Sequence, residues 1–291
     1  MENIRAMWLM IIAMACFATA DGIIKFIAQS ISKGQIMACM GGVGAIIFYL
    51  LCRRARTSVW SSLFFKPVLI ARNIAEVIAA LSIFTALTLA PLSSVAAIIQ
   101  AVPLVITVAA AILLNEKVGL RRWAAVAIGF IGVLIIVRPD ADGLDFALIL
   151  ALLGMLSLSI RDFASRLAPP EATTPLLSFY AFLGLIPAGL ILSITSEGFQ
   201  PIGVSTALHL LIMNVFALGG YFCVTKAMRI GEVSAVSPLR YTRLPFAALV
   251  GYVLFAEIPD MATLTGSALI IGAGLFVMLR ESQIKRNETA I

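Results

Sequence analysis

The sequence predicts an all-α integral membrane protein with ten transmembrane helices arranged as two inverted five-helix repeats. Three observations support this fold class. First, 61% of the 291 residues are hydrophobic and only 12% are charged, against about 25% charged residues in a typical soluble domain. Second, the chain is a series of apolar stretches with short polar breaks. Third, polar positions of the first half recur in the second, which predicts one repeat at 1–141 and another at 142–291.

The apolar stretches have the length that a membrane crossing requires, about 20 residues at 1.5 Å rise each. No polar segment between them is long enough for a soluble domain. The ten expected spans are Ala6–Ala28, Gln35–Cys52, Val68–Ala90, Ser93–Leu114, Trp123–Val137, Phe146–Ser165, Pro175–Thr195, Ala207–Thr225, Val233–Phe255 and Thr263–Leu279.

The first span is expected to be retained, because its apolar run is longer than the core of a signal peptide and no Ala-x-Ala-type cleavage site follows. The four cysteines all fall in or at the ends of apolar stretches, where Cys is a small packing residue. Their spacing fits no metal site. We therefore expect no disulfide, metal or cofactor.

The net charge of +6 does not indicate nucleic-acid binding, because the basic residues are distributed by side. With ten spans and the N-terminus inside, sixteen of the 21 Lys and Arg residues fall on the inner side and only Lys33 and Arg138 on the outer side. The positive-inside rule then places both termini in the cytoplasm.

The repeat is visible when the sequence is shifted by 141 residues. Asp21 and Lys25 then align with Asp162 and Arg166, and other polar matches are Asn73 with Asn214 and Glu116 with Glu257. After a one-residue drift, Pro103 aligns with Pro245. Matching charges are informative here because charges are costly to keep in lipid.

Five helices is an odd number, so the second half must be upside down relative to the first. Inverted repeats are a transporter architecture in which the substrate site lies near the membrane midplane, between the halves. An ancient duplication without a transport role is the alternative.

The segment 86–137, ALTLAPLSSVAAIIQAVPLVITVAAAILLNEKVGLRRWAAVAIGFIGVLIIV, and its second copy at 227–260, AMRIGEVSAVSPLRYTRLPFAALVGYVLFAEIPD, resemble the drug/metabolite transporter superfamily, specifically its EamA-type members. The resemblance covers nearly the whole chain. It implies a multi-pass protein of the bacterial inner membrane that moves a small metabolite by alternating access. The stretch 240–243, Arg-Tyr-Thr-Arg, is similar to a riboflavin-transporter-like subgroup. An amino-acid, drug or other metabolite exporter of the same family is the alternative.

Arg240 and Arg243 are the first candidates for substrate binding. They are three residues apart on the ninth span, so they share a helix face, and Ser237-Pro238 before them can disturb the helix. The functional interpretation is that they bind an anionic or accepting group, with Tyr241 as an aromatic surface. The structural interpretation is a pair neutralised by acidic neighbours.

The third span opens with Arg72, expected to be an interface anchor, followed by Asn73 and Glu76 deeper in the membrane. Glu76 is a candidate partner for a ninth-span arginine and a candidate proton site. Three uncharged residues are further candidates for lining the cavity, although interhelical hydrogen bonding is an equally good role for such side chains: Gln100, Asn214 and Tyr221.

Asp21 and Lys25, four residues apart, are expected to pair within the first helix, and Asp162 and Arg166 within the sixth. The alternative, functional hypothesis is a gate that opens and closes as these residues exchange partners.

The remaining classes are disfavoured. The sequence has no Walker motif for ATP, no His-Glu-x-x-His and no Gly-x-Ser-x-Gly, which argues against an ATP-driven pump and an intramembrane enzyme. It also shows no channel filter. The expected partners are a small-molecule substrate, the lipid bilayer and a proton as candidate coupling ion, with a monomer or homodimer as the assembly.

Overall fold

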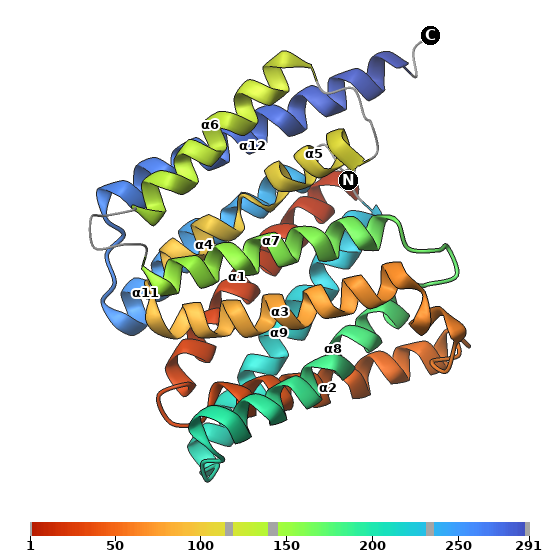
Figure 1. The fold of residues 1–291 in the computed structure, drawn as a ribbon, viewed down its shortest axis with the longest axis vertical. Helices are drawn as coiled ribbons and strands as arrows, with labels where there is room; N and C mark the ends of the chain where they lie inside the picture. The colour runs from red at the N-terminus through yellow and green to blue at the C-terminus, as the bar shows by residue number, and fades with distance from the viewer. Residues whose placement is uncertain (1, 114–118, 139–144, 231–235, 289–291) are drawn as a thin grey trace.

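The computed structural model describes residues 2–113, 119–138, 145–230 and 236–288, and within these ranges the regular structure is entirely helical (Figure 1). Glu116 and the first residues of the ninth expected span lie outside the described residues. The long helices are α1 (Glu2–Ile27), α2 (Lys33–Arg54), α3 (Pro67–Leu89), α4 (Leu92–Ile99), α5 (Val102–Leu113), α6 (Leu120–Val137), α7 (Phe146–Arg166), α8 (Thr174–Leu192), α9 (Val204–Ile230), α11 (Arg243–Phe255) and α12 (Met261–Glu288), with short turns η1 (Ser62–Phe65), η2 (Ser193–Glu197) and η3 (Ser237–Thr242).

Nine segments of the described chain are long and apolar enough to cross a bilayer, with α4 and α5 counted as one. The tenth crossing is η3 followed by α11. Large apolar side chains are exposed on the outer faces of these helices, for example Ile46 on α2, Leu134 on α6 and Leu211 on α9. Such exposure suits lipid rather than water. The predicted fold class, ten helices in two repeats, is confirmed.

The helix pairing is unchanged when the two halves are exchanged. α1 packs on α9 and α3 on α7, while α2 packs on α8, α4 on α11 and α6 on α12. Because α1 corresponds to α7 and α3 to α9, the exchange turns the first pair into the second and leaves the other three as they are. This pattern is a two-fold symmetry. Each half crosses the membrane an odd number of times, so the axis lies in the membrane plane and the repeats are inverted.

Two of these pairs depend on glycine for close approach. A Cβ added at Gly34 of α2 would lie 2.3 Å from the carbonyl oxygen of Gly189 on α8. One added at Gly132 of α6 would lie 2.6 Å from the carbonyl oxygen of Gly266 on α12. Small residues at such crossings let helices pack tightly in lipid, where the hydrophobic effect supplies no attraction between them.

The fourth span is not the continuous helix that was expected. It breaks between α4 and α5 at Gln100 and Ala101, just before Pro103, and the ninth span is a 3₁₀ turn, η3, before α11 and Pro245. Proline removes a backbone donor and clashes with the preceding turn. The two breaks occupy corresponding places in the repeats and contact each other, since Gln100 Nε2 donates to the Arg240 carbonyl over 2.9 Å.

One end of the bundle, here called the distal face, contains the ends of α1, α3 and α11 and the starts of α2, α4 and α12 (left in Figure 1). Polar contacts close it. Lys25 pairs with Glu257 and donates to the Ala90 carbonyl over 2.6 Å, and Glu257 also accepts from the Leu92 N–H at 2.8 Å. The opposite end, where α1 begins, is called the amino-terminal face.

Candidate functional site

A cavity of about 180 Å³ lies among α2, α3, α7, α8 and α9. It therefore draws on both repeats. Its charged residues, Arg72, Glu76 and Arg161, lie toward the amino-terminal face. Arg72 and Arg161 are each five residues from a helix end there, and Glu76 is one turn deeper than Arg72. The rest of the lining is Met40, Ala79, Ala80, Ile83, Phe84, Leu158, Ser178, Ala181, Phe182, Leu185 and Tyr221.

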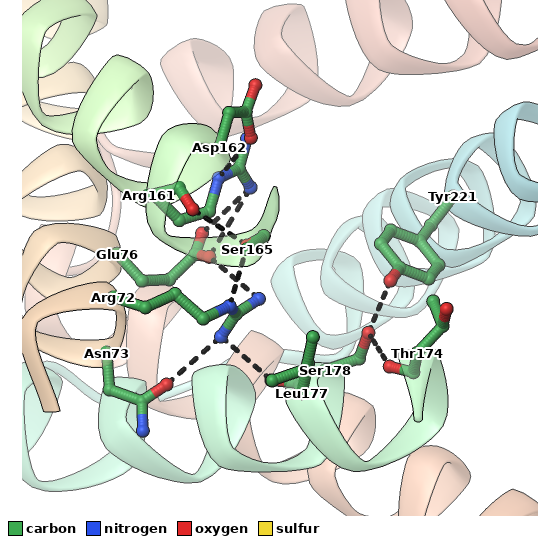
Figure 2. Close-up of polar contacts among 10 residues, drawn as sticks. All are labelled: Arg72, Asn73, Glu76, Arg161, Asp162, Ser165, Thr174, Leu177, Ser178 and Tyr221. Carbon is green, nitrogen blue, oxygen red and sulfur yellow. Dashed lines mark hydrogen bonds and ion pairs between the residues drawn. The ribbon is translucent and has the colours of Figure 1, made fainter. Parts of the chain in front are cut away.

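Glu76 is the centre of a chain of alternating charges (Figure 2). Its Oε2 lies 3.7 Å from Arg72 Nη2 and 3.3 Å from Arg161 Nη1, and Arg161 Nε lies 2.8 Å from Asp162 Oδ1. Two guanidinium groups thus face two carboxylates. Mutual compensation explains how four charges are tolerated inside a membrane protein, where a lone charge costs several kcal/mol.

Arg72 is held by neutral partners as well. Its Nε donates to Ser165 Oγ at 3.1 Å, and its Nη1 donates to Asn73 Oδ1 at 3.0 Å and to the Leu177 carbonyl at 2.8 Å. The residue is only 6% exposed, so its expected role as an interface anchor is wrong. The hydrogen bonds of Arg72 join α3 to α7 and α8. Arg72 therefore fixes the position of Glu76, with which it also forms an ion pair.

Arg161 is held more loosely. Its contacts with the two Glu76 oxygens are 3.3 and 3.4 Å, near the upper limit for a hydrogen bond. Its second terminal nitrogen, Nη2, donates no hydrogen bond to a described residue. The guanidinium group lines the cavity, so this nitrogen is a donor available to a ligand.

Two hydroxyl groups complete the polar side of the site. Ser178 Oγ donates to the Thr174 carbonyl at 2.9 Å and is in hydrogen-bond contact with the Tyr221 hydroxyl. A hydroxyl has one proton, so Ser178 accepts from Tyr221 when it donates to Thr174. This contact fixes the Tyr221 ring of α9 against α8.

The three residues predicted from the ninth span lie elsewhere and do not line this cavity. Arg243 Nη2 pairs with Asp21 Oδ2 of α1 at 2.5 Å. Tyr241 is 6% exposed, and its hydroxyl occupies the space beside Gly274 of α12, where a Cβ would clash. The Arg240 side chain is exposed. Their role in substrate binding stays a prediction.

Of the other predicted lining residues, Tyr221 and Glu76 line the cavity. Asn73 does not line it, but it accepts a hydrogen bond from Arg72, which does. Gln100 instead joins the two helix breaks. Asn214, 3% exposed, donates to the Leu210 carbonyl of its own helix at 2.9 Å.

The pair expected within the first helix is wrong, because Asp21 pairs with Arg243 and Lys25 with Glu257, both across helices. In α7, Asp162 pairs with its neighbour Arg161. Arg166 lies in the last turn of α7. The expected partner of Glu76, a ninth-span arginine, is likewise replaced by Arg72 and Arg161.

Sequence reasoning missed Arg161 and Ser178. Arg161 was assigned to the inner surface with the other basic residues. The available signal was its repeat counterpart, Ala20, which is apolar. A charge present in only one repeat is not explained by the shared fold and is therefore a functional candidate. Ser178 gave no comparable signal.

An all-helical membrane bundle with inverted repeats and a charged cavity between them has the architecture of a membrane transporter. The comparison with protein families makes this specific: the chain belongs to the EamA-like transporter family, whose pattern matches it twice, at residues 4–138 and 145–279. The predicted family membership is confirmed.

Individual relatives carry different names. The chain is 34% identical over 201 residues to a riboflavin transporter of Rhizobium johnstonii, covering 67% of this chain and 65% of that protein. It is 27% identical over 198 residues to an S-adenosylmethionine uptake transporter of Rickettsia felis, covering 68% and 66%. These alignments thus span slightly less than two thirds of the relatives' own length.

Two further matches cover nearly the whole chain. A pseudopaline exporter of Pseudomonas aeruginosa is 24% identical over 266 residues, 91% of this chain and 93% of that protein. The fold also matches that of a protein in a solved crystal structure, over 97% of this chain and 98% of the other, with a TM-score of 0.64 and 18% sequence identity. The last likeness shows the fold alone.

Proposed function

We propose that this protein is a secondary transporter that carries a small polar or amphipathic organic metabolite across the bacterial inner membrane by alternating access, with both termini in the cytoplasm. The substrate site is the cavity around Glu76 and Arg161. Riboflavin is the first substrate to test. Export of an amino acid or another metabolite by the same route is the second candidate, favoured by the full-length match to an exporter.

The observation that carries the proposal is the four-charge chain at the edge of a cavity formed by both repeats. Charged groups inside a membrane are rare and mark substrate or ion pathways. An inverted-repeat carrier keeps its site between the halves and rocks around it. The cavity is smaller than the roughly 300–1,000 Å³ of typical ligand pockets, so binding of a larger metabolite requires the helices to part.

The conformation fits one half of such a cycle. The distal face is closed by Lys25, Glu257 and the backbone groups that they bind, while the charged residues of the cavity lie toward the amino-terminal face. If the N-terminus is cytoplasmic, this is a state closed to the outside. Glu76 remains the candidate carboxylate for proton coupling.

Counterflow in proteoliposomes tests the proposal. Vesicles loaded with excess unlabelled riboflavin should accumulate radiolabelled riboflavin transiently above the level of empty vesicles, because only an alternating-access carrier is stimulated by substrate on the far side. S-adenosylmethionine and a mixture of amino acids are run in parallel. Uptake that is not stimulated by any of these internal substrates contradicts the proposal.

A further inference from the structure

The polar wall of the cavity offers a donor directly beside an acceptor. Arg161 Nη2 donates no hydrogen bond to a described residue, and Arg161 contacts Glu76 only over 3.3 and 3.4 Å, through Nη1. Both groups line the cavity. Figure 2 shows the guanidinium group of Arg161 facing the Glu76 carboxylate from one side and that of Arg72 from the other. A ligand at this edge meets an N–H and a carboxylate oxygen side by side.

The charges of this polar wall balance one another. Arg72 and Arg161 are balanced by Glu76 and Asp162. A ligand with a net charge would add an uncompensated ion to this low-dielectric site, at a cost that only a new partner could offset. A zwitterion would have to lose water from two charged groups at once and displace the existing ion pairs. An uncharged ligand avoids both costs.

The rest of the lining is mostly apolar and partly aromatic. It includes Phe84 of α3, Leu158 of α7, Phe182 of α8 and small residues such as Ala80 and Ala181. Flat apolar surface packs well against such side chains, and aromatic rings add specific contacts. The ligand therefore has two different edges, one that hydrogen bonds and one that is apolar.

From these observations, and resting on the proposed function, we infer that the substrate is an uncharged, flat heterocycle whose amide or imide edge binds in the cavity. A carbonyl oxygen of the ligand accepts from Arg161 Nη2, and the adjacent ring N–H donates to Glu76. Arg161 is thus the residue that determines substrate class, and Arg72 positions Glu76. The planar fork of arginine suits this edge, whereas the point charge of lysine does not.

The test uses the full-length protein in nanodiscs and follows the quenching of flavin fluorescence on binding. The probes are riboflavin, which has an uncharged imide edge, and riboflavin methylated at the imide nitrogen, which cannot donate to Glu76. Wild-type protein should bind riboflavin about tenfold more tightly than the methylated form, as expected for the loss of one buried hydrogen bond to a charged group.

The matching variant is Arg161→Lys, which keeps the charge balance but loses the fork. It should bind riboflavin about tenfold more weakly while its melting temperature stays near that of wild type. Arg138→Lys is the control: Arg138 pairs with Asp260 at 2.6 Å on the exposed distal face, far from the cavity lining, so its riboflavin affinity should not change.

Equal affinity for the two flavins, or full riboflavin affinity in Arg161→Lys, overturns the inference. So does counterflow of S-adenosylmethionine or an amino acid without any binding of riboflavin, although this result leaves the transporter function standing. Conversely, Arg161-dependent binding of riboflavin without counterflow of any substrate supports the binding edge and contradicts the proposed transport. The two failures are therefore distinguishable.

Discussion

The side-chain amide of Gln100 donates a 2.9 Å hydrogen bond to the main-chain carbonyl of Arg240, and this bond joins the break of the fourth span to the 3₁₀ turn of the ninth. The contact relates corresponding points of the two inverted repeats. It gives a polar partner to backbone that is not part of a regular α-helix, which lipid would not supply.

Replacing Gln100 by Leu should therefore destabilise the contact between the two broken helices. The loss of one hydrogen bond and the unpaired Arg240 carbonyl together cost about 1 kcal/mol, or a melting temperature lower by about 2 °C. Thr85→Val is a suitable control, because Thr85 bonds only within its own helix, to the Leu81 carbonyl. An equal effect of the two variants contradicts a special role for the contact.

The ion pair between Lys25 and Glu257 is expected to hold the distal face closed. Glu257→Gln removes the charge attraction but keeps an acceptor for the Leu92 N–H. A cysteine placed at Ala28, three residues after Lys25 and just past the end of α1, should react faster with a membrane-impermeant maleimide in Glu257→Gln than in the parent. Asp260→Asn breaks a distal pair that joins α6 to the start of α12 and should leave the rate unchanged. If both variants behave alike, Lys25 and Glu257 are not a gate.

The pair of Arg243 with Asp21 is expected to be structural. Arg243→Gln or Asp21→Asn alone leaves one charge without its partner inside a span, which costs about 2.5–3.5 kcal/mol on the insertion scale. The double variant removes both charges and should recover most of the lost thermal stability, as a double-mutant cycle would show. If Arg243→Gln is instead fully stable and fails to bind substrate, the original prediction of Arg243 as a substrate-binding residue is supported.

Glu76 is the residue whose replacement should separate proton coupling from binding. Glu76→Gln removes the carboxylate that lines the cavity while keeping an acceptor oxygen. If a proton drives transport, riboflavin uptake by wild-type protein rises with an imposed pH gradient, and this dependence disappears in Glu76→Gln. The same pH dependence in both proteins removes Glu76 from the coupling scheme.

Much of the fold could be predicted because repeat and periodicity are local properties of the sequence. The matches of Asp21 with Asp162 and of Asn73 with Asn214 revealed the duplication, and the odd number of spans implied the inversion. The side-chain pairing could not be predicted in the same way. A spacing of four residues suggests a local pair for Lys25, but its partner, Glu257, is 232 residues away in sequence.

The site was predicted only in part for a similar reason. Glu76, Asn73 and Tyr221 were found because polar residues are conspicuous in apolar spans. Arg161 was not, because counting charges by side treats a basic residue near a helix end as a surface anchor, whereas here the helix end lies beside a cavity. The prediction that Arg240 and Arg243 share a face assumed α-helical geometry, whereas Arg240 lies in the 3₁₀ turn η3 and Arg243 begins α11.

The central claim, that substrate occupies the cavity between the repeats, is tested most directly by protection of a cysteine there. The four native cysteines are replaced by serine and Ala80, in the cavity wall, by cysteine. Riboflavin at saturating concentration should slow maleimide labelling of this position at least fivefold. A cysteine at Trp60, which is 91% exposed outside the helices, should label at the same rate with or without riboflavin. Labelling of position 80 that is unaffected by riboflavin, in a protein shown to transport it, contradicts the claim.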